Sequence, residues 1–183
     1  MIPGVDNLAA YKAPANIIAN TTATVSLQLK STHTLILVSN IKLQSNNWFE
    51  MRIGNGPWKS YEASAVQLDA TKCSIAFIQN QERLSMFFPA SKGTHGWDEV
   101  VGFGTAAFNY WPNGAATAYE ANYTKDLGLF DSDGSVEITQ YGAVGGFVEG
   151  TFTIDPAGYY NVSDSHQIGT YKIEGRFKLK RFQ

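Results

Sequence analysis

The segment that decides the fold lies near the C-terminus and reads Tyr171-Lys172-Ile173-Glu174-Gly175-Arg176-Phe177-Lys178-Leu179-Lys180. Apolar side chains alternate with charged ones along almost all of it. Because successive side chains of a β-strand point to opposite faces, this period of two predicts a strand with one apolar face and one charged face. Such a strand is typical of an antiparallel sheet that covers a core on one side and meets water on the other.

The same alternation recurs through most of the chain. It predicts three strands in the last third and further strands over residues 24–30, 33–43, 48–53, 58–66, 72–78, 83–88, 103–110 and 117–123. No ten-residue window shows a convincing helical period of 3.6. About ten short strands at regular spacing indicate an all-β protein, either an antiparallel β-sandwich or a flattened barrel.

The pattern divides the chain into two parts. Residues 1–47 are an N-terminal arm with one or two strands, whose pairing partners the sequence leaves open, either within this chain or in a neighbouring molecule. Residues 48–183 are the β-sandwich domain. Within that domain, Pro and Gly residues predict a long loop over residues 89–102, and Asp131-Ser132-Asp133-Gly134 predicts a turn.

The composition argues against nucleic-acid binding and against a membrane span. The chain has 183 residues, of which 16% are charged, and its formal net charge is −2. Without a basic excess to neutralise phosphates, we expect no nucleic-acid binding. The longest apolar run, Leu35–Val38, is far too short for a membrane span, and the first six residues do not resemble a signal peptide. The single cysteine, Cys73, lies in a predicted strand and is expected to be a small buried residue.

Catalytic chemistry has little support in the sequence. The three histidines, His33, His95 and His166, are far apart and show no zinc-ligand spacing. The one group that could serve a hydrolase is His95 with Asp98 and Glu99, in the predicted Gly-rich loop. We therefore expect no catalytic residue and no cofactor, and keep a hydrolase as the last alternative.

Asp131 and Asp133 form a weak calcium candidate. Their spacing resembles the start of a calcium-binding loop, but Gly134 stands at the fourth place, where such a loop has its glycine at the sixth. Asp side chains also stabilise turns by bonding to their own backbone. A hairpin turn explains both residues as well, so we expect no metal.

Aromatic residues are the best binding candidates. Trp48 and Trp58 stand in predicted strands and are expected in the core. Other aromatic rings lie in or beside predicted loops, where they can stack on sugars, anchor a protein interface or cap the ends of the core. These residues are Trp97, Tyr110, Trp111, Tyr159 and Tyr160.

Several motifs resemble small secreted or lipoprotein-like β-domains of Bacteroidetes. Residues 51–60 contain the strand, Gly turn and Trp with which those domains begin, and Leu84-Ser85-Met86-Phe87-Phe88-Pro89 resembles their next segment. Gly150-Thr151-Phe152 and Gly175-Arg176-Phe177 resemble their ending. The resemblance covers residues 48–183. It implies a β-sandwich in an extracytoplasmic setting and no catalytic residues, since those domains are mostly of unknown function.

Three functions follow as hypotheses. The first is a non-enzymatic structural or assembly module of a filament, phage particle or cell-surface complex, which binds proteins or copies of itself through the N-terminal arm. The second is a carbohydrate-binding module that uses the loop aromatics. The third is the hydrolase with its site near His95.

Overall fold

The structure, a computed structural model, describes residues 21–28, 36–43, 47–98 and 105–182. The chain divides into two compact units, residues 1–46 and residues 47–183, and each is described separately. Glu99, one of the three hydrolase candidates, lies outside the described residues.

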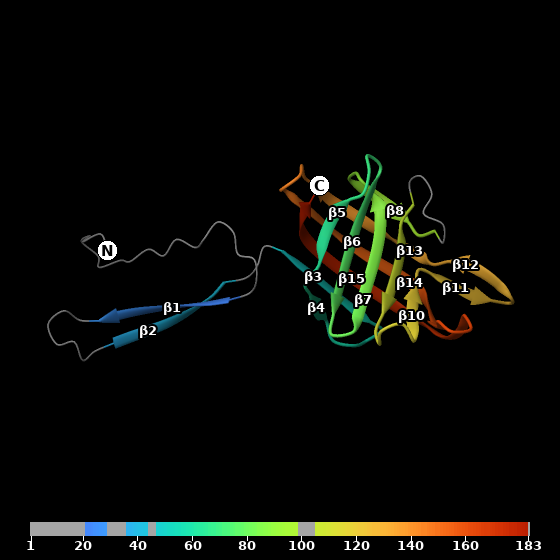
Figure 1. The fold of residues 1–183 in the computed structure, drawn as a ribbon, viewed down its shortest axis with the longest axis horizontal. Coiled ribbons are helices and arrows are strands. Elements are labelled where there is room, and N and C mark those ends of the chain that lie inside the picture. Colours follow the sequence, from blue (N-terminus) through green and yellow to red (C-terminus); the bar gives the residue numbers. More distant parts are fainter. Residues whose placement is uncertain (1–20, 29–35, 44–46, 99–104, 183) are drawn as a thin grey trace. The chain divides into compact units, whose positions relative to one another are not determined.

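The first unit contains a two-stranded antiparallel hairpin of β1 (Thr21–Gln28) and β2 (Ile36–Leu43), shown in Figure 1. The sequence predicts strands over residues 24–30 and 33–43, of which residues 29–35 lie outside the described residues. β1 begins three residues before its predicted start, and β2 ends where predicted. Thr24 pairs with Asn40, and its Oγ1 donates a hydrogen bond of 3.0 Å to Asn40 Oδ1. The next pair in the register, Ala23 with Ile41, is apolar.

The second unit is built from short strands that lead into two long ones. The strands are β3 (Trp48–Ile53), β4 (Lys59–Tyr61), β5 (Ser64–Gln67), β6 (Lys72–Gln79), β7 (Glu82–Pro89), β8 (Gly93–Gly96), β9 (Ala107–Trp111), β10 (Thr117–Glu120), β11 (Asn122–Lys125), β12 (Gly128–Asp131), β13 (Asp133–Tyr141), β14 (Phe147–Asn161) and β15 (His166–Phe182). The prediction of an all-β protein is confirmed for the described residues.

No helix in the described ranges is long and apolar enough to cross a membrane.

Eleven of these strands form one mixed sheet in the order β4-β3-β15-β5-β6-β7-β9-β10-β14-β13-β8, and β11 pairs with β12 in a separate sheet. All strand pairs of the large sheet are antiparallel except β5 with β15. Because β15 also pairs with β14, the pairings from β15 through β5, β6, β7, β9 and β10 to β14 return to their starting point.

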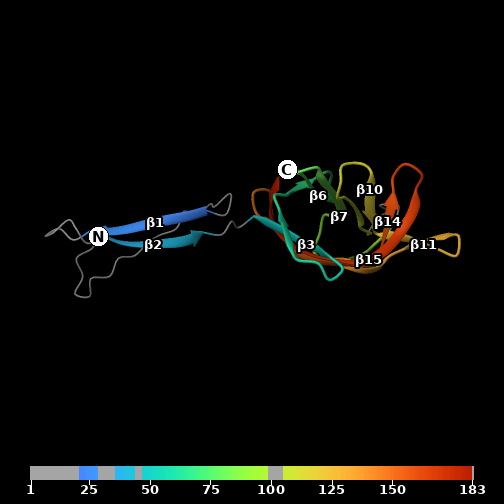
Figure 2. The same ribbon diagram turned by 90° about the horizontal axis from the view of Figure 1, so that it is seen from below.

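The core lies between the two sides of this sheet. Figure 2 shows β6, β7 and β10 on one side of the second unit and β3 and β15 on the other. The apolar face predicted for β15 is buried at Ile173, Phe177 and Leu179, which are fully inaccessible to solvent. Phe177 stacks on Phe49 with ring centroids 6.2 Å apart. Cys73 is buried, as predicted.

Three sequence predictions are wrong in detail. The predicted loop over residues 89–102 contains β8, which pairs with β13. The predicted turn at Asp131–Gly134 is extended instead, because Ser132 is tied down between β12 and β13: its backbone N–H donates to Ala121 O and its Oγ to Pro156 O, at 3.0 and 2.6 Å.

The third correction concerns Trp58, which is 41% exposed and not in the core. The Arg52 and Arg176 guanidinium groups lie 5.1 and 5.0 Å from its ring centroid. Cation–π contacts of this kind stabilise an aromatic ring at a surface. Trp48, the other tryptophan expected in the core, is only half-buried.

The tight packing of β15 gives a prediction. Gly175 pairs with Phe152 of β14, and a Cβ added at Gly175 would stand 2.1 Å from atoms of the Phe152 ring. We expect Gly175→Ala to lower the free energy of unfolding by about 1–3 kcal/mol, because the ring must move out of its packed position. Urea unfolding followed by fluorescence measures this change.

Gly169→Ala is the matched control in the same strand, since its Cβ would meet nothing closer than Tyr171 at 3.6 Å. The control should stay within about 0.5 kcal/mol of the unmodified chain. Equal effects of the two substitutions would contradict the packing argument.

Candidate functional site

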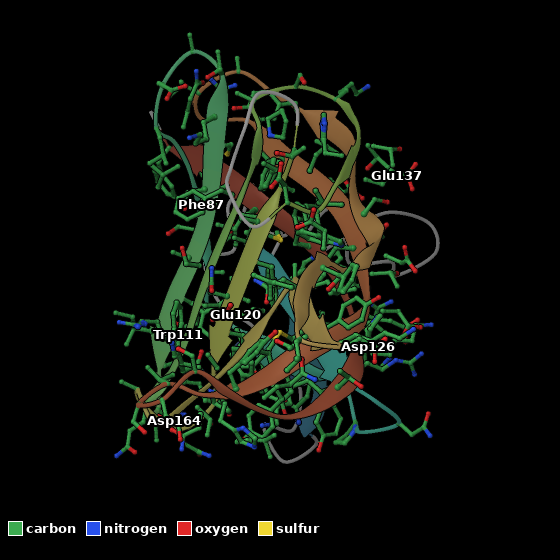
Figure 3. All side chains as sticks on the ribbon, turned by 90° about the vertical axis from the view of Figure 1, so that its right-hand side faces the viewer. Phe87, Trp111, Glu120, Asp126, Glu137 and Asp164 are labelled. Atoms are coloured by element: carbon green, nitrogen blue, oxygen red, sulfur yellow. The ribbon has the colours of Figure 1, made fainter. Side chains whose placement is uncertain are left out.

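Two of the five predicted binding aromatics, Trp111 and Tyr160, line one cleft of about 440 Å³. This volume is within the usual range for small-molecule sites. Trp111 ends β9 and lies next to Glu120 on the side of the domain shown in Figure 3. The cleft is lined by Trp111, Glu120, Asn122, Thr124, Leu129, Tyr160, Asn161, Val162 and Ser165.

Strand register explains why these side chains meet. β10 lies between β9 and β14, with Tyr119 opposite Tyr110 and Ala118 opposite Tyr160. Side chains at paired positions share a face of the sheet, and neighbours along a strand lie on opposite faces. Tyr110 therefore points into the core, whereas Trp111, the next residue, lies on the outer face.

A fixed chain of hydrogen bonds forms the polar part of the cleft. Tyr160 Oη donates to Asn122 Oδ1 at 3.0 Å, and Asn122 Nδ2 donates to Glu120 Oε2 at 3.2 Å. Asn122 is only 7% exposed, so its amide is held in one orientation by these two partners. The Glu120 carboxylate is half-buried and makes no salt bridge within the described part of the chain.

Trp111 stacks against the guanidinium group of Arg83. The Arg83 guanidinium lies 4.0 Å from the centroid of the Trp111 ring, and the two residues pair between β7 and β9. Arginine stacked on an indole fixes the plane of the ring. It also covers one face, so at most one face of the Trp111 ring is open to a ligand.

The β11–β12 hairpin forms one wall of the cleft. Gln167 of β15 holds this hairpin in place: its Oε1 accepts from the Thr124 backbone N–H at 2.6 Å, and its Nε2 donates to Thr124 O at 3.1 Å. Leu129 on the wall is 48% exposed. The cleft therefore combines an apolar wall, an aromatic ring and a fixed polar group.

The structure places the other predicted aromatics outside this cleft. Trp97 is a core residue whose Nε1–H donates to Thr153 O at 2.8 Å. Tyr110 is also buried, and its hydroxyl is 3.2 Å from that of Tyr61. Tyr159 is half-buried and stacks on Tyr119 with ring centroids 4.4 Å apart. Alternation separates Tyr110 from Trp111 along β9 and Tyr159 from Tyr160 along β14.

Tyr110 borders a second, smaller cavity of about 190 Å³. Met51, Ile53, Pro57 and Tyr61 are among its other lining residues, so most of its surface is apolar. Burial, above all, raises the pKa of Tyr110 to about 12, and it raises that of Tyr61 still further. These hydroxyls stay protonated at ordinary pH, as expected of structural residues.

The hydrolase candidates His95 and Asp98 and the calcium candidates Asp131 and Asp133 do not line either cavity. His95 is in β8, and Asp98 follows Trp97, which bridges to Ala106. Asp131 ends β12 and Asp133 begins β13, and both are exposed. Across the described ranges, no group of three or more His, Cys, Asp or Glu side chains is placed to hold a metal ion.

Sequence reasoning missed Glu120 and Asn122, which supply the polar part of the site. The available signal is the position of Glu120 in a predicted strand, two residues after Ala118 and therefore on the same face. That signal alone does not show that Tyr160, forty residues later, lies beside it.

No protein-family model, curated protein or solved structure matches this chain. The resemblance to Bacteroidetes domains stays a prediction.

The buried tyrosines give a prediction about alkaline pH. Burial raises the pKa of Tyr110 from 10.0 to about 12. A group whose pKa is higher in the folded state stabilises that state fully below its unfolded pKa and stops doing so as the pH rises through the folded value. We therefore expect the melting temperature to fall between pH 10 and 12, together with a late rise of tyrosinate absorbance.

Tyr110→Phe tests this assignment, because it removes the ionising hydroxyl and keeps the ring. Its melting temperature should fall less steeply between pH 10 and 12 than that of the unmodified chain. An unchanged slope would show that Tyr110 does not contribute to alkaline unfolding.

Proposed function

We propose that this chain is a non-enzymatic carbohydrate-binding module and that the cleft at Trp111 and Tyr160 is its site. The observation that carries the proposal is the Tyr160–Asn122–Glu120 hydrogen-bond chain beside the Trp111 ring. Sugars combine hydroxyl groups, which carboxylates and amides bind well, with apolar C–H faces that stack on aromatic rings. The cleft offers both kinds of contact.

Binding is favoured over hydrolysis by the number of carboxylates. Glycosidases generally place two carboxyl groups on either side of the bond that they cleave. Glu120 is the only carboxylate among the described residues that line the cleft, and its Oε2 already accepts a hydrogen bond from Asn122. A single carboxylate held in this way serves recognition better than acid–base chemistry.

Trp111→Ala tests the sugar site. On a glycan array, the unmodified chain should bind a subset of glycans, and Trp111→Ala should lose roughly tenfold or more in affinity, because stacking and the shape of the cleft are lost.

Trp58→Ala is the matched control, since Trp58 is also a surface tryptophan stacked with arginine but does not line the cleft. It should bind like the unmodified chain. An array without hits, or equal losses in both variants, would refute the proposal.

We propose self-association through the N-terminal hairpin as a second function, consistent with an assembly module at a cell surface or in a particle. The supporting observation is that β1 and β2 pair only with each other among the described strands. A two-stranded hairpin alone is marginally stable in water, and strand addition by another molecule is a common way to complete one. Ile41 of β2 supplies an apolar, half-buried side chain for such a contact.

Ile41→Lys in the full chain tests this second function. Ile41 is half-buried, whereas its neighbour Asn40 is exposed, so Asn40→Lys adds the same charge at a position that faces water. Light scattering after size-exclusion chromatography should show an oligomer for the unmodified chain and for Asn40→Lys, but a monomer for Ile41→Lys. A monomer in all three samples would exclude self-association.

For the fold itself, we propose a flattened barrel over a sandwich of two open sheets. The proposal is supported by the ring of pairings that leads from β15 through β5 and β10 back to β14. Closure removes the free edges that two open sheets would carry.

A further inference from the structure

We infer that the cleft selects sugars by charge: it takes sugars with a protonated amino group in preference to neutral ones, and it rejects uronic acids. The inference rests on the proposed sugar-binding function. It starts from the fact that, among the nine described residues that line the cleft, Glu120 is the only carboxylate and none is Lys, Arg or His. The other lining residues are apolar or carry neutral hydroxyl and amide groups.

Glu120 differs from the other half-buried glutamates of the domain. Glu174 pairs with Arg52 and Lys172 at 2.6 and 3.1 Å, and Glu50 pairs with Arg176 at 2.7 Å. Glu120 has no such partner within the described residues. A partly buried carboxylate without a cation attracts one, because water screens it less than it screens an exposed group.

Arg83 is a cation in contact with a lining residue, because its guanidinium lies on the Trp111 ring. Arg83 is not a lining residue, and it makes no salt bridge with Glu120. Its charge therefore orients the indole and leaves the carboxylate available to a ligand.

The geometry of the carboxylate favours an ammonium group. Asn122 uses one position on Oε2, so Oε1 and the remaining lone pairs stay open on a group whose orientation is fixed. An ammonium group carries three donors and a positive charge, whereas a hydroxyl donates one hydrogen bond. A uronate would bring a second carboxylate into the same cleft, where like charges repel.

The test compares three β-1,4-linked tetramers, of glucosamine, glucose and glucuronic acid, by isothermal titration at low salt on the full chain. The glucosamine tetramer should bind about tenfold more tightly than the glucose tetramer, as expected for one charge-assisted hydrogen bond, and the glucuronic acid tetramer should not bind. The preference should shrink as salt is added.

Glu120→Gln keeps an acceptor for Asn122 and removes the charge, so the affinity ratio of the glucosamine and glucose tetramers should fall to about one. Glu137→Gln is the control, because Glu137 is exposed on β13 and lies on the opposite side of the view in Figure 3 from Trp111, and because the substitution changes the net charge equally. This control should keep the unmodified ratio.

The outcomes separate the two proposals. Equal binding of the glucosamine and glucose tetramers overturns charge selection and leaves sugar binding standing. A preference that survives Glu120→Gln, or that Glu137→Gln abolishes equally, overturns the role of Glu120. Failure of all three tetramers to bind overturns charge selection, and an array without hits overturns sugar binding as well.

Discussion

The large sheet depends on the antiparallel pairing of β14 with β15. These are the longest strands, with 15 and 17 residues, and they stay paired from Phe147–Lys180 to Asn161–His166 across two register shifts. β15 also pairs with β3 and β5, and β14 with β10 and β13. Every other strand of the sheet except β7 either pairs with β14 or β15 or is separated from them by a single strand. An error in this one register would therefore move almost every strand.

The same pairing separates the core from the candidate site. Because neighbours along a strand face opposite ways, Tyr110 of β9 lies in the core and Tyr119 of β10 packs against it, whereas Trp111 and Glu120, the residues that follow them, line the cleft. Tyr110 and Trp111 are the clearest case, since adjacent residues stabilise the protein and line the cleft respectively. A substitution at one can thus affect stability with little direct effect on the site.

The sequence predicts the strands better than it predicts the site. Alternation identifies β15 because the buried and exposed positions of such a strand are filled by alternating apolar and charged residues, which are visible in the sequence of the strand itself. The extended path at Ser132 is not visible in this way, since it depends on bonds to Ala121 and Pro156, which are distant in sequence. Trp111 and Tyr160 were predicted as binding residues from loop signals, but their meeting with Glu120 depends on which strands become neighbours.

The way in which β11 and β12 join the domain has a consequence for how this protein can diversify. The hairpin turns at Asp126 and Leu127, both with positive φ, and among the described strands it forms no ladder with the large sheet. It supplies one wall of the cleft and is fastened through Gln167. Its tip can therefore gain, lose or exchange residues without shifting any strand of the sheet, so that new ligand preferences can arise while the folding of the domain is preserved.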